Sequence, residues 1–503
     1  MTVRAVMVLG TTSGAGKSWL ATALCRWYAR QGLRVAPFKA HNMSNNARAV
    51  PGPGGVIGEI GSAQYFQALA ARAEPEVRMN PVLLKPERDT HSQVVVMGQV
   101  HAELTDVPWR ERSERLWPFA RDALRGLMAE NDVVVIEGAG SPAEINLHAS
   151  DYVNMRTARE VRAACLLVTD IDRGGAFAHL YGTHALLPAE ERALIRGFVL
   201  NRFRGDARLL APGPEQLQQL CGVPTVAVLP MWRGHGLPEE DGVFDEGPSG
   251  WNSAPATSPT TGAVQIAIVA FPHISNLDEF QPLRQCAGAR LRWVRAPAEL
   301  AGADWVVLPG SKHTSGDLAW LRATGLADAV ARHAQSGGRV LGVCGGLQML
   351  GAALIDEYGV EGQVNSPIEG LGLLPLVTRF ERSKLLRRTR SRFTELAAPW
   401  SALAKVTFSG YEIRQGRTEA VVGATSMTAA LRNDEGQLIG WQRGNVLGAY
   451  AHGLFESDAR DARVVRRRTS ATRSGVRRPR RLHRPALPTR RASRIDSMTR
   501  GIR

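Results

Sequence analysis

The chain has 503 residues, 44% of them hydrophobic and 22% charged, so it has room for two or three globular domains, each with its own core. No stretch approaches the roughly 20 apolar residues of a membrane span, and the N-terminus begins a strand-like segment without a cleavable signal pattern. The five cysteines are scattered and odd in number, which favours a reducing compartment over a disulfide framework. We therefore expect a cytoplasmic protein without a membrane span.

The net charge of +15 lies almost entirely at the C-terminal end. Residues 460–503 contain 16 Arg and two Asp, a net charge of +14, which leaves +1 for residues 1–459. The main part of the chain thus lacks the basic surface of a nucleic-acid-binding protein, and no nucleic-acid partner is expected. The oligomeric state is left open.

A phosphate-binding loop opens the chain. Residues 3–9 form an apolar run that predicts a buried strand, followed by Gly-Thr-Thr-Ser-Gly-Ala-Gly-Lys-Ser at 10–18 and a helix from Trp19. Backbone N–H groups of such a loop surround phosphates, while Lys17 reaches the terminal ones and Ser18 can bind Mg²⁺. Thr11 stands where the strict pattern has glycine. The expected nucleotide-binding residues are Thr11, Thr12, Ser13, Gly14, Ala15, Gly16, Lys17 and Ser18.

Two acidic residues are further candidates for binding Mg²⁺ beside Ser18. Glu137 follows the apolar run 133–136, so it is expected at the carboxyl end of a strand, where ligands bind in open α/β sheets. Glu59 is expected to open a helix, where a solvated first-turn glutamate is an equally good explanation. Strands that alternate with helices predict a mostly parallel, doubly wound sheet.

Residues 339–350 predict a strand, a sharp Gly-x-Cys-x-Gly turn and a helix. Such a turn exposes the side chain of Cys344 and places its sulfur at a helix N-terminus, which favours a thiolate. A small buried cysteine at a helix start is the alternative. His452, at the end of another apolar run, supplies a base that can meet Cys344 only in the folded chain.

Residues 264–457 resemble a class I glutamine amidotransferase domain, a flavodoxin-like fold, in the cysteine turn, the Pro-Gly-Ser loop at 309–311 and His452. The resemblance implies that Cys344 attacks the glutamine amide and that His452 transfers the proton. Many such domains have glutamate two residues after the histidine, where Leu454 stands here, so we expect a Cys–His dyad and assign no role to Glu456. The oxyanion-binding residues implied are Gly310, Ser311 and Gly345.

The phosphate loop resembles that of dethiobiotin synthetase, and blocks along the whole chain resemble the cobyric acid synthases. These blocks are residues 39–45, 79–86, 170–175, 201–206, 274–280, 309–314 and 409–412. The resemblance implies a P-loop NTPase-like α/β domain and amidation of the b, d, e and g carboxylates of adenosylcobyrinic acid a,c-diamide. ATP and Mg²⁺ would activate each carboxylate as an acyl phosphate, and glutamine would donate the nitrogen. Candidate substrate or phosphate contacts are Asn42, Asp172 and Arg173, for which turn and capping roles are the alternative.

Three rival functions remain. The sister synthase that amidates the a and c acetates of cobyrinic acid uses the same two chemistries, as does a cell-wall amidotransferase with a different ligase. A nucleic-acid-binding regulatory ATPase would use the phosphate loop as a switch and the basic tail as an arm. Such a switch has no use for a nucleophilic thiol.

We divide the chain into an amidoligase domain (1–245), a linker rich in Gly, Pro, Ser and Thr (246–262), a glutaminase domain (263–458) and a basic tail (459–503). Residues 378–403 suit either an amphipathic helix or an exposed connection. The tail, which lacks an apolar face, is expected to be disordered. It is either an arm for nucleic acid or a membrane surface, or, as we favour, the product of a change in reading frame near residues 458–466.

Deleting residues 461–503 should leave folding intact, because this segment has no apolar face to pack on either domain. Thermal unfolding followed by circular dichroism should give the same cooperative transition for the full and the shortened chain. Loss of that transition on truncation would show that the tail belongs to the folded structure.

Overall fold

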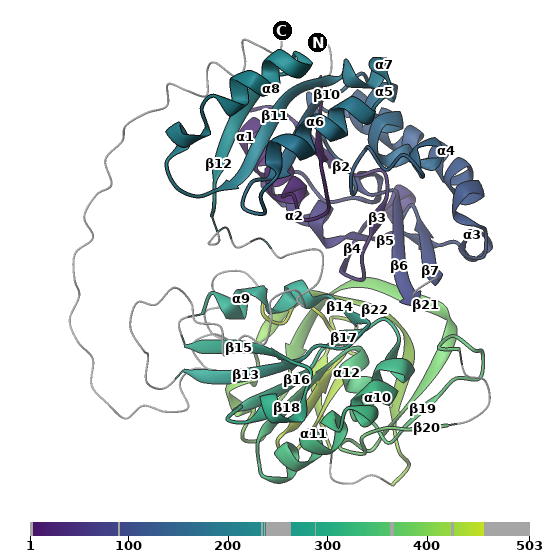
Figure 1. Cartoon of the computed structure of the whole chain (residues 1–503). Coiled ribbons are helices and arrows are strands. Elements are labelled where there is room, and N and C mark those ends of the chain that lie inside the picture. The colour runs from purple at the N-terminus through teal and green to yellow at the C-terminus, as the bar shows by residue number, and fades with distance from the viewer. Residues whose placement is uncertain are drawn as a thin grey trace.

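The computed structural model describes residues 4–88, 91–232, 235, 237, 263–286, 288–362, 367–423 and 427–456. Two lobes, formed by residues before and after the expected linker, lie one above the other in Figure 1. The linker at 246–262 and the tail at 459–503 fall outside the described residues, so their expected disorder stays a prediction.

The first domain is built on a six-stranded sheet in the order β12-β11-β10-β1-β9-β2, and every neighbouring pair is parallel. Its strands are β1 (Arg4–Gly10), β2 (Val35–Phe38), β9 (Val133–Glu137), β10 (Ala164–Asp170), β11 (Ile195–Phe203) and β12 (Thr225–Pro230). The main helices are α1 (Lys17–Arg30), α2 (Ser62–Ala71), α4 (Trp109–Glu130), α6 (Ala176–Leu186) and α8 (Gly213–Cys221). The doubly wound parallel fold predicted from alternating strands and helices is confirmed.

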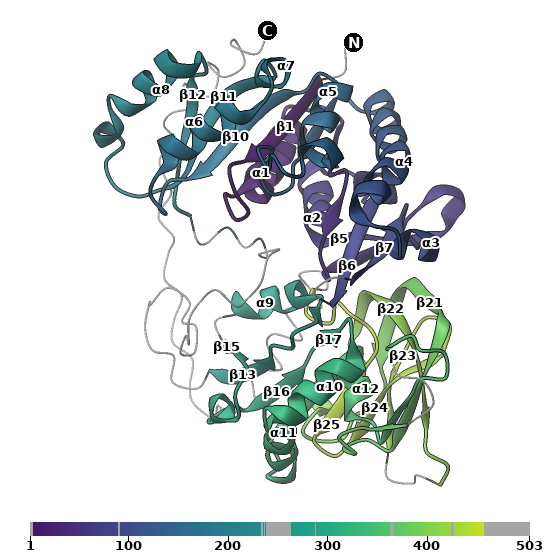
Figure 2. The ribbon, with the colours of Figure 1, turned by 45° about the vertical axis from the view of Figure 1, so that its right-hand side comes forward.

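Short strands between β2 and α4 form two small sheets at the end of this domain that faces the second lobe (Figure 2). An antiparallel hairpin joins β4 (Ala47–Pro51) and β5 (Ile57–Gly61). The other sheet contains β3 (Asn42–Met43), β6 (Val82–Arg88), β7 (His91–Val96) and β8 (Gln99–Val100). This end of the domain, rather than its main sheet, supplies the contacts to the second domain that are described below.

The second domain has a parallel half in the strand order β15-β13-β16-β18-β25. Its strands are β13 (Val264–Val269), β15 (Ala289–Val294), β16 (Trp305–Leu308), β18 (Arg339–Val343) and β25 (Val446–Ala449). Its helices include α9 (Gln281–Arg284), α10 (Thr314–Ala323), α11 (Leu326–Gln335) and α12 (Gly345–Leu350). The described helices of both domains include none that is long and apolar enough to cross a membrane.

A mostly antiparallel half, in which only the described pair of β19 and β21 is parallel, extends the same sheet beyond β25, which the sequence analysis did not anticipate. Its strands are β19 (Ala353–Ile355), β20 (Ile368–Glu369), β21 (Leu376–Phe393), β22 (Thr407–Ala420), β23 (Thr428–Arg432) and β24 (Leu438–Arg443). Most of residues 378–403, for which a helix or a connection was expected, belong to β21, so that expectation was wrong. Thr389, Ser391 and Phe393 are buried while Arg390 and Arg392 are exposed, an alternation typical of a strand with one covered face.

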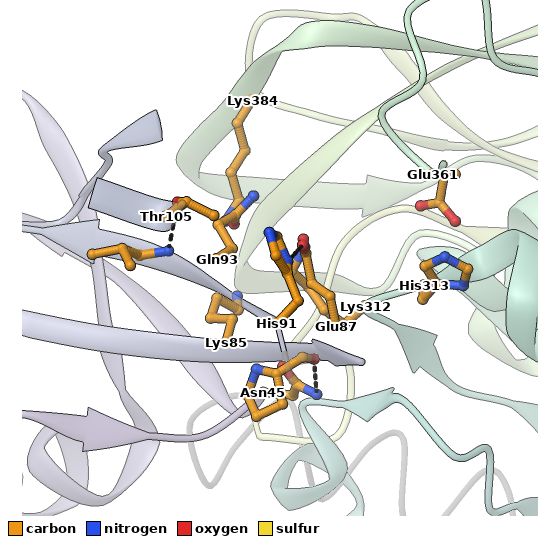
Figure 3. Close-up of polar contacts among 12 residues, drawn as sticks. Asn45, Lys85, Glu87, His91, Gln93, Thr105, Lys312, His313, Glu361 and Lys384 are labelled. Carbon is orange, nitrogen blue, oxygen red and sulfur yellow. Dashed lines mark hydrogen bonds and ion pairs between the residues drawn. The ribbon is translucent and has the colours of Figure 1, made fainter. Parts of the chain in front are cut away.

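The two domains share a polar and apolar interface. Ala47 and Leu83 of the first domain form one buried cluster with Tyr411 and Ile413 of the second. Figure 3 shows polar side chains from both domains meeting around Lys312. Ion pairs between the described residues of the two domains include Lys384–Glu59, Lys312–Glu87, Arg388–Glu74, Arg48–Asp278 and Arg48–Glu456.

Candidate active sites

The phosphate loop joins β1 to α1 and wraps around Lys17. The Lys17 amine donates to the carbonyl oxygens of Thr12 and Gly140, each at 3.0 Å. A Cβ at Gly10 would lie 2.9 Å from Cδ of Lys17, so the glycine displaced by one position makes room for this side chain. Gly16 has φ 96°, a conformation that favours glycine. The loop therefore has the geometry that its sequence predicts.

The residues expected to bind Mg²⁺ beside this loop are Ser18 and Glu137. The Ser18 hydroxyl donates to Oε1 of Glu137 at 2.8 Å, and the Lys39 ammonium lies 3.0 Å from the same oxygen. Burial opposes ionisation of Glu137, but Lys39 and the hydrogen bonds from Gln67 and Ser18 outweigh it and lower its pKa. An anionic carboxylate next to a hydroxyl at the start of α1 is a suitable donor set for Mg²⁺.

Glu59, the other acid expected to bind Mg²⁺, takes part in two ion pairs. It lies inside β5 rather than at the start of a helix, and it is fully buried. Its carboxylate pairs with Lys85 at 2.9 Å and with Lys384 from the second domain. Although burial raises it, these two ammonium groups lower the pKa of Glu59 to about 2. The expected place of Glu59 at the start of a helix was therefore wrong, while its binding of Mg²⁺ stays a prediction.

A cavity of about 500 Å³ opens beside the phosphate loop. Its described lining includes Lys39, His41 and Asn42, so Asn42 lies where substrate contact was expected. The lining also includes Asn46 on the loop before β4 and Asp278 of the second domain. The cavity of the first domain thus reaches the interface.

The other two candidate substrate residues, Asp172 and Arg173, are not part of the cavity's described lining. Asp172 accepts hydrogen bonds from Arg204. The side chain of Arg173 is 68% exposed, and a guanidinium nitrogen lies 3.8 Å from the Cβ position of Gly14. Arg173 therefore stands beside the phosphate loop, whereas Asp172 is committed to an ion pair.

Cys344 occupies a strained turn between β18 and α12. Its φ and ψ are 50° and −106°, a conformation that non-glycine residues rarely adopt. A Cβ at Gly346 would lie 1.9 Å from the carbonyl oxygen of Leu308, and one at Gly345 would lie 2.8 Å from the backbone nitrogen of Ser311. The glycines that flank Cys344 are required by this close packing, and the predicted strand–turn–helix is confirmed.

His452 is fully buried beside Cys344, with a different neighbour on each ring nitrogen. Nδ1 lies 3.0 Å from Oε1 of Glu279, while Nε2 lies 3.2 Å from the amide nitrogen of Asn276. Burial alone would lower the pKa of His452, but Glu279 and Cys344, through charge and hydrogen bonds, raise it to about 10. A histidine beside the sulfur forms the nucleophile–base pair that the sequence predicts.

Glu279 is the functional candidate that the sequence analysis missed. Its fully buried carboxylate contacts His452 and is a third member beside the expected Cys–His dyad. The second carboxylate oxygen accepts a hydrogen bond from the backbone N–H of Gly453 at 3.2 Å. Glu279 stands 173 positions before His452, so no local spacing could have indicated the pair. Glu456, left unassigned, contacts Arg48 of the first domain instead.

The residues expected to bind the oxyanion lie together. Gly310 and Ser311 form β17, which pairs with β14 (Ile274–Ser275). A Cβ at Gly310 would lie 3.0 Å from Cε1 of His452, and Gly345 packs against the backbone of Ser311. The structure therefore gathers Cys344, His452, Gly310, Ser311 and Gly345 at one place.

Comparison with known proteins agrees with both halves. Residues 6–233 match the family described as the CobQ/CobB/MinD/ParA nucleotide binding domain, and residues 265–460 match the CobB/CobQ-like glutamine amidotransferase domain. The chain is 73% identical to the cobyric acid synthase of Methylibium petroleiphilum over 90% of this chain and 89% of that one. It is 69% identical to that of Leptothrix cholodnii over 91% of this chain and 90% of that one. It is 67% identical to that of Variovorax paradoxus over 91% of this chain and 92% of that one.

A nucleotide-binding domain joined to a glutaminase domain defines a glutamine-hydrolysing ligase, an amidotransferase. The identity of more than two thirds over nine tenths of the length narrows this class to one family. The chain belongs to the cobyric acid synthase family.

Replacing Glu279 by Gln should lower the kcat of glutamine hydrolysis by about 100-fold, within the range of a lost acid–base contribution. Because Glu279 raises the pKa of His452, its removal lowers that pKa, and the imidazolium is then lost at a lower pH. The alkaline limb of the glutaminase pH profile should move to lower pH. The control is Glu435→Gln, which alters an exposed carboxylate of the same domain. It should change neither kcat nor the position of the alkaline limb. An unshifted limb in Glu279→Gln would remove Glu279 from the mechanism.

Proposed function

We propose that the enzyme amidates the b, d, e and g carboxylates of adenosylcobyrinic acid a,c-diamide in cobalamin biosynthesis, with ATP and glutamine as co-substrates. One observation carries the proposal beyond family membership. The cavity at the phosphate loop extends to Asp278, the residue next to Glu279 of the glutaminase site. The site that would activate a carboxylate is thus open toward the site that would release ammonia.

Cys344 would begin the release of ammonia. Its sulfur attacks the side-chain carboxamide carbon of glutamine, while backbone N–H groups at Gly345 and Ser311 stabilise the oxyanion. His452 then gives its proton to the departing nitrogen, so that ammonia leaves and a thioester remains. Water, deprotonated by the same imidazole, cleaves the thioester to glutamate and restores the thiol. Glu279 keeps Nδ1 occupied, which directs Nε2 toward these proton transfers.

The phosphate loop would make the carboxylate reactive. A carboxylate oxygen attacks the terminal phosphorus of ATP, which releases ADP and forms an acyl phosphate. Ammonia then attacks the acyl carbon, phosphate leaves, and the amide remains. Lys17 is placed to neutralise charge on the transferred group. Ser18 and Glu137 would hold Mg²⁺, which neutralises phosphate charge when bound.

Internal transfer of ammonia between the two sites would favour this chemistry. Ammonia is mostly protonated near neutral pH, and ammonium has no lone pair with which to attack an acyl phosphate. Ammonia released beside His452 and passed toward the cavity near Asp278 escapes that loss. The joining of both catalytic domains in one chain is consistent with such a transfer.

Incubation with glutamine, Mg-ATP and the a,c-diamide should give four successive mass losses of about one unit each, because every step replaces OH by NH₂. Mass spectrometry of the corrinoid provides the measurement. Absence of these products, together with turnover of another carboxylic acid, would show that the enzyme acts on a different substrate.

The two half-reactions should separate by mutation. In Cys344→Ala, glutamine no longer supports amidation but an ammonium salt still does, because the phosphate loop is intact. In Lys17→Ala, both nitrogen sources fail, with a loss of at least about 100-fold expected for removal of charge stabilisation in the transition state. Glutamine-dependent amidation by Cys344→Ala would contradict the assigned nucleophile.

A further inference from the structure

A strand of the first domain inserts an arginine beside the glutaminase site of the second. Arg48 belongs to β4, and its side chain is only 2% exposed. Directly before Arg48 in sequence, two hydrogen bonds from backbone N–H groups to asparagine side chains join the domains. The N–H of Ala47 donates to Oδ1 of Asn276 at 2.9 Å, and the N–H of Leu277 donates to Oδ1 of Asn46 at 3.0 Å.

The guanidinium group of Arg48 pairs with two carboxylates, one directly before Glu279 in sequence and one four residues after His452. One nitrogen bonds Asp278, which directly precedes Glu279. Another contact joins Nη2 to Oε1 of Glu456 at 2.6 Å, on the turn that follows His452. Burial opposes the charge of Arg48, but both carboxylates outweigh it and raise the pKa of Arg48 well above its usual value.

Arg48 also packs on the ring that covers His452. Its guanidinium carbon lies 5.2 Å from the ring centre of Tyr411. That ring is stacked on the imidazole of His452, with centres 5.2 Å apart and planes at 19°. The backbones of Tyr411 and His452 exchange two hydrogen bonds. One side chain of the first domain therefore contacts three residues that border the histidine.

We propose that Arg48, a residue of the nucleotide-binding domain, is a positioning residue for the glutaminase. It holds the turn that carries Glu279 and the segment that carries His452 in register, so hydrolysis of glutamine depends on a strand of the other domain. The proposal rests on the glutaminase role given above to Cys344 and His452. Because Asn46 and Asp278 both line the cavity of the first domain, the same contacts lie where the two active sites approach each other.

Removal of Arg48 would act on both geometry and charge. The carboxylates of Asp278 and Glu456 would lose their buried counter-charge, and Tyr411 would lose its packing partner. The charged and titratable groups around the imidazole are then Cys344, Glu279 and Tyr411, with Asp278 and Glu456 behind them. A more negative surrounding favours the protonated ring, so the alkaline limb of the glutaminase pH profile should move to higher pH, opposite to the shift expected for Glu279→Gln.

The test compares Arg48→Lys with the triple variant Arg48→Met, Asp278→Asn, Glu456→Gln in the full chain. The lysine keeps one charge but cannot reach both carboxylates, and the triple variant removes the buried charges together, so that folding is not lost to an unpaired carboxylate. Glutamate release should fall by roughly 100-fold in kcat/KM, the scale of an ångström-sized misplacement of a catalytic group. Arg48→Met alone, which removes the positive charge and leaves both carboxylates, should show the shift of the alkaline limb, whereas Arg48→Lys and the triple variant should not.

Two controls separate positioning from general damage. Arg388→Met breaks an exposed ion pair with Glu74 across the same interface and should leave glutamate release unchanged. Amidation with an ammonium salt should stay within about twofold in Arg48→Lys and Arg388→Met, because it does not need Cys344. Thermal unfolding measures the folded fraction of every variant.

The proposal is overturned if Arg48→Lys and the triple variant both release glutamate at the rate of the unaltered enzyme. It is also overturned if ammonium-dependent amidation by Arg48→Lys falls in parallel with glutamate release, because Arg48 would then serve the fold or the first domain. If the unaltered enzyme does not amidate the a,c-diamide with ammonium, the substrate assignment fails. Glutamate release and thermal unfolding still decide the role of Arg48 in that case, since neither needs the corrinoid.

Discussion

The turn at residues 276–279 is the constraint on which the arrangement of both sites depends. Asn276 accepts a hydrogen bond from Ala47 of the first domain and touches the ring of His452 with the other end of its amide. Asp278 meets Arg48, and Glu279 holds the second nitrogen of the ring. Asn276 has φ 54°, a left-handed conformation that asparagine tolerates better than most residues. A few residues of backbone thus join the interface to the catalytic histidine.

Parallel strands explain why the reactive groups collect at loops. The phosphate loop, Glu137, Cys344 and His452 each lie at or after the carboxyl end of a strand, namely β1, β9, β18 and β25. In an open α/β sheet this edge is where connecting loops can surround a ligand. The two domains reuse the same rule, and the hairpin of β4 and β5 fills the space between the resulting loops.

Local features were predictable from the sequence because they depend on consecutive residues. The phosphate loop and the cysteine turn require glycines at fixed offsets, and the contacts that a Cβ would make at Gly10 and Gly346 show the steric reason. Glu137 could be placed through the rule for strand ends. Each of these inferences needs only the chain within one strand, one turn and one helix.

Features that depend on distant pairing could not be predicted in this way. Glu279 is one acid among many until the fold brings it to His452, and Glu59 looks like a helix-capping glutamate until two lysines close on it. The strand β21 could not be recognised from alternating apolar and polar residues, because it carries many charged side chains. It pairs with β22, and one of its faces is buried only in part of its length. Sequence spacing carries no information on such contacts.

The apolar and ionic parts of the interface have different physical consequences. Residues such as Leu83 and Ile413 gain from leaving water in any orientation that covers them, since the hydrophobic effect has no direction. Burying Arg48 with Asp278 and Glu456 gives little net stability, because desolvation offsets most of the attraction, yet an unpaired charge there would cost about 3–5 kcal/mol. Orientations that separate these charges are thereby excluded. The apolar cluster accounts for association of the domains. The ion pairs of Arg48 with Asp278 and Glu456 select the alignment in which the turn at 276–279 reaches His452.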